Sequence, residues 1–172
     1  MMTTIETKRL VLRKPINDDW ADMRDFFMSE RAQYVGGPYT LGRAWRQFSA
    51  EVGHWSLLGC GMWAVTEKTY GKLQGFVGAW CPADWPEREI GWVMLERAEG
   101  KGFGFEAAQA AIHDVYNRLK WDTAVSYIMH ENVRSIALAL RLGATLDKHA
   151  QRPNSEAYPC LVYRHPKSEV LS

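Results

Sequence analysis

Residues 89–112 read Glu89-Ile-Gly-Trp-Val-Met-Leu-Glu-Arg-Ala-Glu-Gly-Lys-Gly-Phe-Gly-Phe-Glu-Ala-Ala-Gln-Ala-Ala-Ile112. The stretch begins as an apolar strand and continues as a turn with glycine at alternate positions, Gly100, Gly102 and Gly104. Apolar residues then recur at helical spacing as far as Val115, which predicts an amphipathic helix. Glycine adopts positive φ and lets a ligand approach the backbone, and the first turn of a helix has unpaired N–H groups. We therefore expect an anion site at this turn, phosphate above all.

Two sharper phosphate-binding motifs do not fit this turn. A Walker loop ends in Gly-Lys-Ser/Thr, whereas Gly104 is followed by Phe105 and Glu106. A dinucleotide fingerprint has the pattern Gly-x-Gly-x-x-Gly, in which the relaxed form ends in alanine. The residue three after Gly102 is Phe105 and the one three after Gly104 is Ala107, so only the relaxed form fits. That fingerprint opens a doubly wound domain, and this turn lies past the middle of the chain. A strand-to-helix connection that uses glycine only for its geometry remains an alternative.

The composition is that of a globular protein without an unusual charge. The chain has 172 residues, 47% apolar and 24% charged, with a formal charge of +1. We expect one domain at 1–165 and a polar tail at 166–172. The small charge gives no reason to expect nucleic acid or an anionic membrane as a partner. Three scattered cysteines without metal or disulfide spacing, and no signal or membrane-spanning segment, favour a cytoplasmic protein.

The region before the turn predicts one strand, two helices and an antiparallel hairpin. The first strand is expected at 7–13. Asn17 or Asp18 can cap a helix that runs to Gly36, and Thr40 can cap a second one whose polar residues Arg43, Arg46 and Gln47 lie opposite its apolar face. Strands are then expected at 62–66, 75–80 and 88–95.

The region after the turn predicts a crossover. A helix at 103–119, a strand at 123–128, a helix capped by Asn132 and closed by Gly143, and strands at 145–149 and 156–163 follow one another. A strand, a helix and a strand in succession imply a parallel pair, so the sheet must be mixed. The fold class is therefore α/β.

The order of these elements resembles that of the GNAT superfamily of acyl-CoA-dependent N-acetyltransferases. The resemblance rests on the start of the chain, on the turn Gly-Lys-Gly-Phe-Gly-Phe-Glu-Ala, and on Asn132-Val-Arg-Ser-Ile-Ala-Leu-Ala-Leu-Arg-Leu-Gly-Ala144, and the branch it most resembles is the RimJ/RimL-like group. It implies a mixed, mostly antiparallel twisted sheet of about six or seven strands with helices on both faces. A splayed parallel pair would form the cleft for acetyl-CoA, the implied co-substrate.

The resemblance also implies where acetyl-CoA binds. Backbone groups near Val93, Met94 and Leu95 would pair with the pantetheine arm, and Asn132 would hydrogen-bond it. The pyrophosphate would lie on the turn, at Gly100, Lys101, Gly102, Phe103 and Gly104. One departure concerns Glu99, where the family has Gln or Arg. A carboxylate here is expected to weaken CoA binding unless Arg97 and Lys101 compensate.

Glu89 is the predicted general base. An α-amino group, with a pKa of about 7.7–8.0, needs only modest assistance to lose its proton. The alternative for Glu89 is a surface ion pair with Arg88 or a lysine. Ser135, a position at which the RimJ/RimL-like group also has serine, is the predicted acid near the CoA sulfur, with helix capping as its alternative. Tyr127 is the substitute acid if it faces the cleft.

Aromatic residues are the predicted walls of an acceptor site: Trp20, Tyr34, Tyr39, Trp80 and Trp85. An aromatic cleft without a strong carboxylate cluster would suit a peptide N-terminus, an amino acid or a small apolar amine better than a polyamine. The His-Glu-x-x-His zinc pattern fails because position 134 is arginine, so no metal is expected. The resemblance implies a homodimer as one assembly. A non-catalytic module of the same fold that binds acyl-CoA or a nucleotide remains the alternative function.

Overall fold

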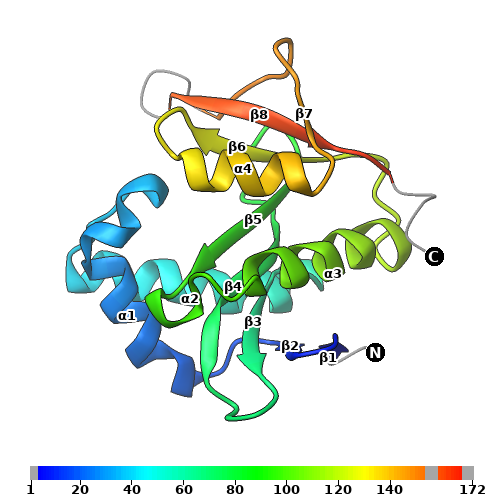
Figure 1. The fold of residues 1–172 in the computed structure, drawn as a ribbon. Coiled ribbons are helices and arrows are strands. Elements are labelled where there is room, and N and C mark those ends of the chain that lie inside the picture. The colour runs from blue at the N-terminus through cyan, green and yellow to red at the C-terminus, as the bar shows by residue number, and fades with distance from the viewer. Residues whose placement is uncertain (1–3, 154–158, 168–172) are drawn as a thin grey trace.

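Within residues 4–153 and 159–167, the part of the chain that the computed structural model describes, eight strands form one sheet in the order β1-β2-β3-β4-β5-β6-β8-β7 (Figure 1). The strands are β1 Thr4–Glu6, β2 Leu10–Arg13, β3 Met62–Glu67, β4 Leu73–Trp80, β5 Glu89–Met94, β6 Ala124–Met129, β7 Thr145–Leu146 and β8 Cys160–His165. The α-helices are α1 Trp20–Met28, α2 Leu41–Leu58, α3 Phe103–Asn117 and α4 Val133–Arg141. The predicted mixed α/β sheet is confirmed, because β5 and β6 are parallel and the other neighbours are antiparallel.

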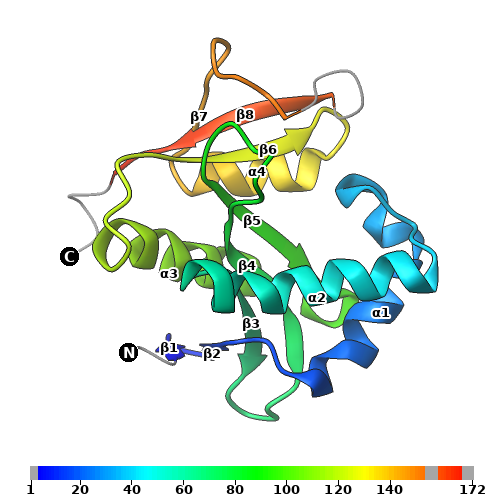
Figure 2. The ribbon, with the colours of Figure 1, turned by 180° about the vertical axis from the view of Figure 1, so that it is seen from behind.

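The helices cover both faces of the sheet. Helices α1 and α2 lie on one face, and α3 and α4 lie on the other (Figures 1 and 2). Alternate residues of the central strands point to opposite faces. Met62 and Phe76 therefore pack with the buried residues of α1 and α2, whereas Val65 and Val77 pack with those of α3.

The first predicted strand is shorter than expected. The interval 7–9 is a turn, and it folds β1 back against β2. The carboxylate of Glu106 on α3 accepts hydrogen bonds from Thr7 Oγ1 at 2.6 Å and from the Arg9 amide at 2.8 Å. Since Glu106 lies far along the chain, the local pattern does not reveal this break and the prediction of one strand at 7–13 is wrong.

The first helix also differs from its prediction at both ends. Asp19, rather than Asn17 or Asp18, binds the entering chain, because its buried carboxylate accepts from the Ile16 amide at 2.9 Å and pairs with Arg13. Helix α1 then ends at Met28, and a 3₁₀ helix, Glu30–Val35, continues to Gly36.

The other predicted helix termini are confirmed. The side chain of Thr40 accepts from the Arg43 amide and begins α2. Gly102, at a φ of +74°, precedes α3, and the side chain of Asn132 accepts from the Ser135 amide to begin α4. The last two strands are present and pair with each other, but β7 ends at Leu146 rather than at residue 149. Strand β8 continues to His165, and residues 156–158 of the strand expected at 156–163 lie outside the described residues.

Strands β5 and β6 pair only at their start. Glu89 is in register with Val125, and the Val125 amide donates to the Arg88 carbonyl oxygen at 3.1 Å. One residue further on, the Ser126 hydroxyl donates to the Ile90 carbonyl oxygen at 2.6 Å, so a side chain replaces the backbone ladder. Beyond this point the strands diverge and leave an open edge along β5.

The described helices do not include one with the length and apolar character needed to cross a lipid bilayer. The three cysteines, Cys60, Cys81 and Cys160, are all unpaired.

Candidate active site

Two cavities open on either side of the divergence of β5 and β6. The first, of about 400 Å³, lies between α2, the 3₁₀ helix Glu30–Val35 and the starts of β5 and β6, and we call it the carboxyl cavity. The second, of about 870 Å³, lies between the glycine turn and α4, and we call it the turn cavity. The residues that line both are Tyr34, Val35, Trp92, Val93, Asn132 and Ser135. The cavities are therefore contiguous at the open edge of β5.

The glycine turn forms one wall of the turn cavity. Gly100, Lys101, Gly102 and Gly104 line it at the start of α3, and their role as an anion site stays a prediction. A Cβ at Gly104 would stand 3.5 Å from Met94 Cγ, so glycine keeps this wall open. The side chain of Phe103 does not line the cavity but is buried in the core beneath α3, with Arg9 over its ring. The contribution of Phe103 to the site is confined to its backbone.

Glu99 lies between two arginines at the mouth of the turn cavity. Its carboxylate is 2.5 Å from Arg31 and 2.7 Å from Arg134, and these two partners lower the pKa of Glu99 to about 2, with Arg134 contributing most. Arg97, which was expected with Lys101 to compensate for this carboxylate, pairs with Asp22 instead. With Arg31, Lys101, Arg134 and Arg141 against Glu30 and Glu99, the lining has an excess of positive charge that suits phosphate.

Alternate residues of β5 present their backbone to the open edge. The Arg88 carbonyl oxygen accepts from β6, and the Met94 carbonyl oxygen accepts from Arg31. Because backbone groups of a strand point alternately to its two sides, the backbone of Trp92 faces the same edge as those of Arg88 and Met94. The Leu95 amide instead donates to the Gln74 carbonyl oxygen at 2.8 Å, and Leu95 is buried. Of the predicted pantetheine contacts at Val93, Met94 and Leu95, the backbone of Met94 lies on the open edge, together with that of Trp92, and that of Leu95 does not.

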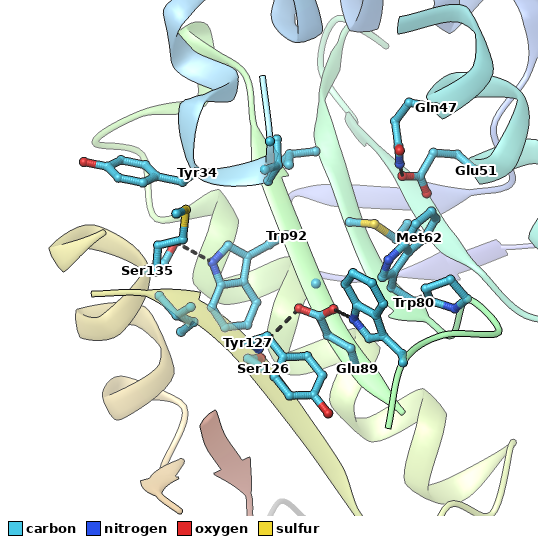
Figure 3. A pocket seen from close by; sticks show the side chains of 18 of the residues that line it. Tyr34, Gln47, Glu51, Met62, Trp80, Glu89, Trp92, Ser126, Tyr127 and Ser135 are labelled. Atoms are coloured by element: carbon cyan, nitrogen blue, oxygen red, sulfur yellow. Dashed lines mark hydrogen bonds between the residues drawn. The ribbon is translucent and has the colours of Figure 1, made fainter. Parts of the chain in front are cut away.

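Ser135 stands where the two cavities meet. Its hydroxyl oxygen accepts from Trp92 Nε1 at 3.0 Å, so the hydroxyl proton is available to a group in the gap (Figure 3). The Ser135 amide donates to the Asn132 side chain at 3.2 Å, and this contact orients both residues at the first turn of α4. The two predictions about Ser135, helix capping and a place at the site, are thus compatible, because its amide takes part in the cap and its hydroxyl faces the cavities.

Glu89 lies in the wall of the carboxyl cavity and does not form the surface ion pair that was its alternative. Its carboxylate accepts from Trp85 Nε1 at 2.6 Å and from the Tyr127 amide at 3.3 Å. Arg88 instead lies over the ring of Trp121. Removal from water raises the pKa of Glu89 to about 8, although the two donors partly oppose the shift. A carboxyl that titrates near neutral pH can both accept and release a proton.

A second carboxyl, that of Glu51 on α2, lines the same cavity. Its side chain is buried, and its Oε1 accepts from Gln47 Nε2 at 3.0 Å. Burial is the main reason that the pKa of Glu51 is raised to about 8, and the charge of Glu89 adds to it. Sequence reasoning missed Glu51 and expected no strong carboxylate cluster. The available signal was the spacing of Arg43, Gln47 and Glu51, which places all three on one stripe of α2 facing the cavity.

Four of the five predicted aromatic walls do line the carboxyl cavity: Tyr34, Tyr39, Trp80 and Trp85. Trp20 does not, because it packs edge-on against Trp45 at 5.0 Å, between α1 and α2. Tyr127 also lines the cavity, and burial raises the pKa of its hydroxyl well above the ordinary value. Figure 3 shows Glu51, Trp80, Glu89 and Tyr127 around one space.

Comparison with known proteins agrees with this geometry. Residues 9–145 match the model of the acetyltransferase (GNAT) domain family. A crystal structure of an acetyltransferase from Agrobacterium tumefaciens str. C58 is 36% identical, with 96% of this chain and 95% of that chain covered and a TM-score of 0.90.

Two further solved structures share the fold at lower identity. RimL, described as a ribosomal L7/L12 α-N-protein acetyltransferase, is 18% identical over 95% of this chain and 93% of its own, with a TM-score of 0.71. The microcin C7 self-immunity acetyltransferase MccE, in complex with acetyl-CoA and AMP, is 17% identical over 92% of each chain, with a TM-score of 0.69. The family match over most of the chain, together with the open edge of β5 and the glycine turn, shows that this chain belongs to the GNAT acetyltransferase family, whose members transfer acetyl groups from acetyl-CoA.

Proposed function

We propose that this protein acetylates a primary amine by direct attack on acetyl-CoA, with both substrates bound at once. The observation that supports this best is the meeting of the two cavities at the open edge of β5. Glu89 lies on one side of that meeting point, and Ser135 lies at it. One cavity takes the acetyl donor and the other the acceptor amine.

The donor fits the turn cavity by charge and by backbone geometry. The amides at the start of α3 face the anion, and Arg31, Lys101 and Arg134 supply positive charge for the phosphates. The backbone of Trp92 and Met94 is placed for the pantetheine arm, with the Asn132 side chain opposite. Acetyl-CoA, when bound, supplies a thioester carbonyl at which an amine can attack. An amide aimed at the oxygen of that carbonyl lowers the barrier by about 3 kcal/mol.

Glu89 is proposed as the general base. The amine lone pair forms the new C–N bond, the C–S bond breaks, and the proton of the nitrogen passes to Glu89 directly or through one water. Its raised pKa matches this work at neutral pH, because such a carboxylate is a stronger base than an exposed one.

Ser135 is proposed to stabilise the departing thiolate. Because Trp92 Nε1 occupies a lone pair of its oxygen, the Ser135 hydroxyl is oriented to donate toward the gap. The thiolate accepts a hydrogen bond from this hydroxyl as the C–S bond breaks and takes its proton from solvent. Tyr127 is the weaker candidate, since it lines the carboxyl cavity and does not line the turn cavity.

The acceptor class can be narrowed in part. The resemblance to the RimJ/RimL-like group favours a protein N-terminal α-amine, whereas a cavity of about 400 Å³ favours an amino acid or a small amine. Pockets for small ligands typically measure about 300–1,000 Å³. We propose the small amine as the acceptor.

A thermal-shift titration followed by an amine panel tests the proposal. Acetyl-CoA and CoA, but not ATP or NAD, should raise the melting temperature, because a ligand at a hundred times its Kd stabilises a fold by about 2.7 kcal/mol. Release of the CoA thiol then reports turnover. Binding of acetyl-CoA without turnover of any amine would support the non-catalytic module instead.

A further inference from the structure

Glu51 is the unexplained group of the carboxyl cavity. It is only 4% exposed, and its second oxygen, Oε2, has no hydrogen-bond partner among the residues that the structure describes. A buried carboxyl with an unsatisfied oxygen destabilises the fold. The proposed chemistry uses Glu89 and gives Glu51 no role. Its position at the cavity wall points to a ligand as the missing partner.

The two carboxyls belong to different elements. Glu51 comes from the middle of α2, whereas Glu89 begins β5. In Figure 3 they lie apart, with Met62 and Trp80 drawn between them. A single small amine at Glu89 therefore leaves Glu51 unoccupied, and a ligand that satisfies both needs a polar group at each end.

The charge of the lining decides which polar group Glu51 receives. Three carboxyl-bearing residues line the cavity in the described part of the chain, Glu51, Asp84 and Glu89, against one cationic residue, Arg43, whose guanidinium lies over the ring of Tyr39. An amino acid would bring its own carboxylate beside Glu51 and Glu89, and this charge would make the ionised form of Glu89, which the proposed base needs, harder to reach. An ammonium group instead favours the ionised form of Glu51 and pairs with it.

We propose that the acceptor is a compact diamine whose reacting amine lies at Glu89 and whose second ammonium is bound by Glu51. Gln47 holds Oε1 of Glu51, which leaves Oε2 for the ligand. The aromatic walls between the two ends enclose the aliphatic chain. This assignment rests on the proposed acetyl transfer, and it makes Glu51 the residue that selects a diamine over a monoamine. It reverses the sequence-based preference for an apolar amine.

The test compares 1,4-diaminobutane with 1-aminobutane, which differ only in the second amine. We expect kcat/KM, measured by release of the CoA thiol, to be about 30-fold or more higher for the diamine, as for a charge pair removed from water. In Glu51→Gln, which keeps the size of the side chain and removes its charge, this preference should fall to near unity, because the loss of kcat/KM falls mainly on the diamine.

Two further variants act as controls. Asp25→Asn removes a carboxylate that is exposed on α1 and paired with its neighbour Arg24, so it should leave the preference unchanged. Glu51→Asp keeps the charge but withdraws it from the cavity, so it should retain the preference and shift it toward a longer diamine. Thermal unfolding confirms that each variant is folded.

The outcomes separate this inference from the proposed function. Equal kcat/KM for the two amines in the wild type, or an equal loss for both in Glu51→Gln, would overturn the role of Glu51 while leaving acetyl transfer intact. If no amine is turned over, calorimetry of 1,4-diaminobutane with the CoA complex decides. Binding that is lost in Glu51→Gln supports the ammonium site without catalysis, and binding that is absent or equal in both proteins refutes it.

Discussion

Glu89 has to lose its proton before it can accept one from an amine. The cavity makes that loss harder by removing the carboxyl from water, so that the pKa of about 8 lies well above the ordinary value of 4.5. The hydrogen bonds from Trp85 and from the Tyr127 amide oppose this shift, and the charge of Glu89 in turn raises the pKa of Glu51. The burial that makes the Glu89 carboxylate a stronger base therefore also lowers the fraction of Glu89 that is deprotonated at neutral pH.

Replacing Glu89 by glutamine should reveal this titration. We expect Glu89→Gln to lower kcat/KM by about 10²–10⁴-fold, the usual contribution of a general base. The ratio of wild-type to variant kcat/KM should rise about tenfold per pH unit below pH 8 and level off above it. Protonation of the acceptor amine changes kcat/KM equally in both proteins, so it cancels in the ratio. A ratio that does not change with pH would mean that Glu89 is not the base.

The same substitution should change how stability depends on pH. Between the unfolded pKa of 4.5 and the folded pKa of about 8, the folded state holds a proton on Glu89 that the unfolded state has lost. The contribution of Glu89 to the free energy of unfolding therefore falls as pH rises through this interval. Glu89→Gln should flatten that part of the curve of melting temperature against pH.

Among the elements, β5 and the turn after it form the proposed site of the donor. The parallel pair begins normally and is then interrupted by the hydroxyl of Ser126, which takes the Ile90 carbonyl. The open edge that follows leads directly to the turn and to the first residues of α3. Backbone groups for the pantetheine arm and for the phosphates thus come from one continuous segment.

Gly104 tests this segment. Its Cβ position lies at ordinary contact distance from Met94 and Leu138, 3.5 and 3.7 Å, so a side chain fits the fold but projects into the turn cavity. We expect Gly104→Val to raise the Kd of acetyl-CoA about tenfold or more, a loss of about 1.4 kcal/mol. Gly53→Val in α2, where a Cβ would meet nothing within 4 Å, is the matched control. Unchanged affinity in Gly104→Val would exclude this wall as the phosphate site.

The elements also show what a sequence can predict. The glycine turn and the caps at Thr40 and Asn132 depend on residues three or four positions apart, and these predictions are confirmed. The break at 7–9 depends on Glu106, and the direction of Glu51 depends on how α2 packs on the sheet. Such contacts join distant parts of the chain, so no local pattern contains them.

For the whole molecule, the distribution of charge matters more than its sum. The formal charge is only +1, yet arginines gather at the turn cavity around Glu99. Two of them are held by this one carboxylate, which joins the 3₁₀ helix Glu30–Val35 to α4 across the cavity. Glu99 both positions these arginines and reduces their attraction for phosphate.

The dependence of acetyl-CoA affinity on salt shows which of these two effects of Glu99 is larger. We expect Glu99→Gln, which keeps a hydrogen-bond acceptor and removes the charge, to tighten acetyl-CoA binding about threefold to tenfold at low ionic strength. The gain should shrink as salt screens the arginines. Asp25→Asn is again the remote control, and calorimetry at several salt concentrations is the measurement. Weaker binding at every ionic strength would show that positioning by Glu99 outweighs its charge.

The two cavities also draw most of their separate walls from different parts of the chain. Leaving aside the residues that line both, the carboxyl cavity uses mainly 36–91, whereas the turn cavity uses mainly 94–141. Under the proposed assignment of the acceptor to the carboxyl cavity and of acetyl-CoA to the turn cavity, changes in the first interval alter which amine is accepted without disturbing the segment that meets acetyl-CoA. Replacing α2 and the start of β5 by the corresponding segments of a relative, in evolution or by design, would therefore change the acceptor cavity and leave the turn cavity as it is.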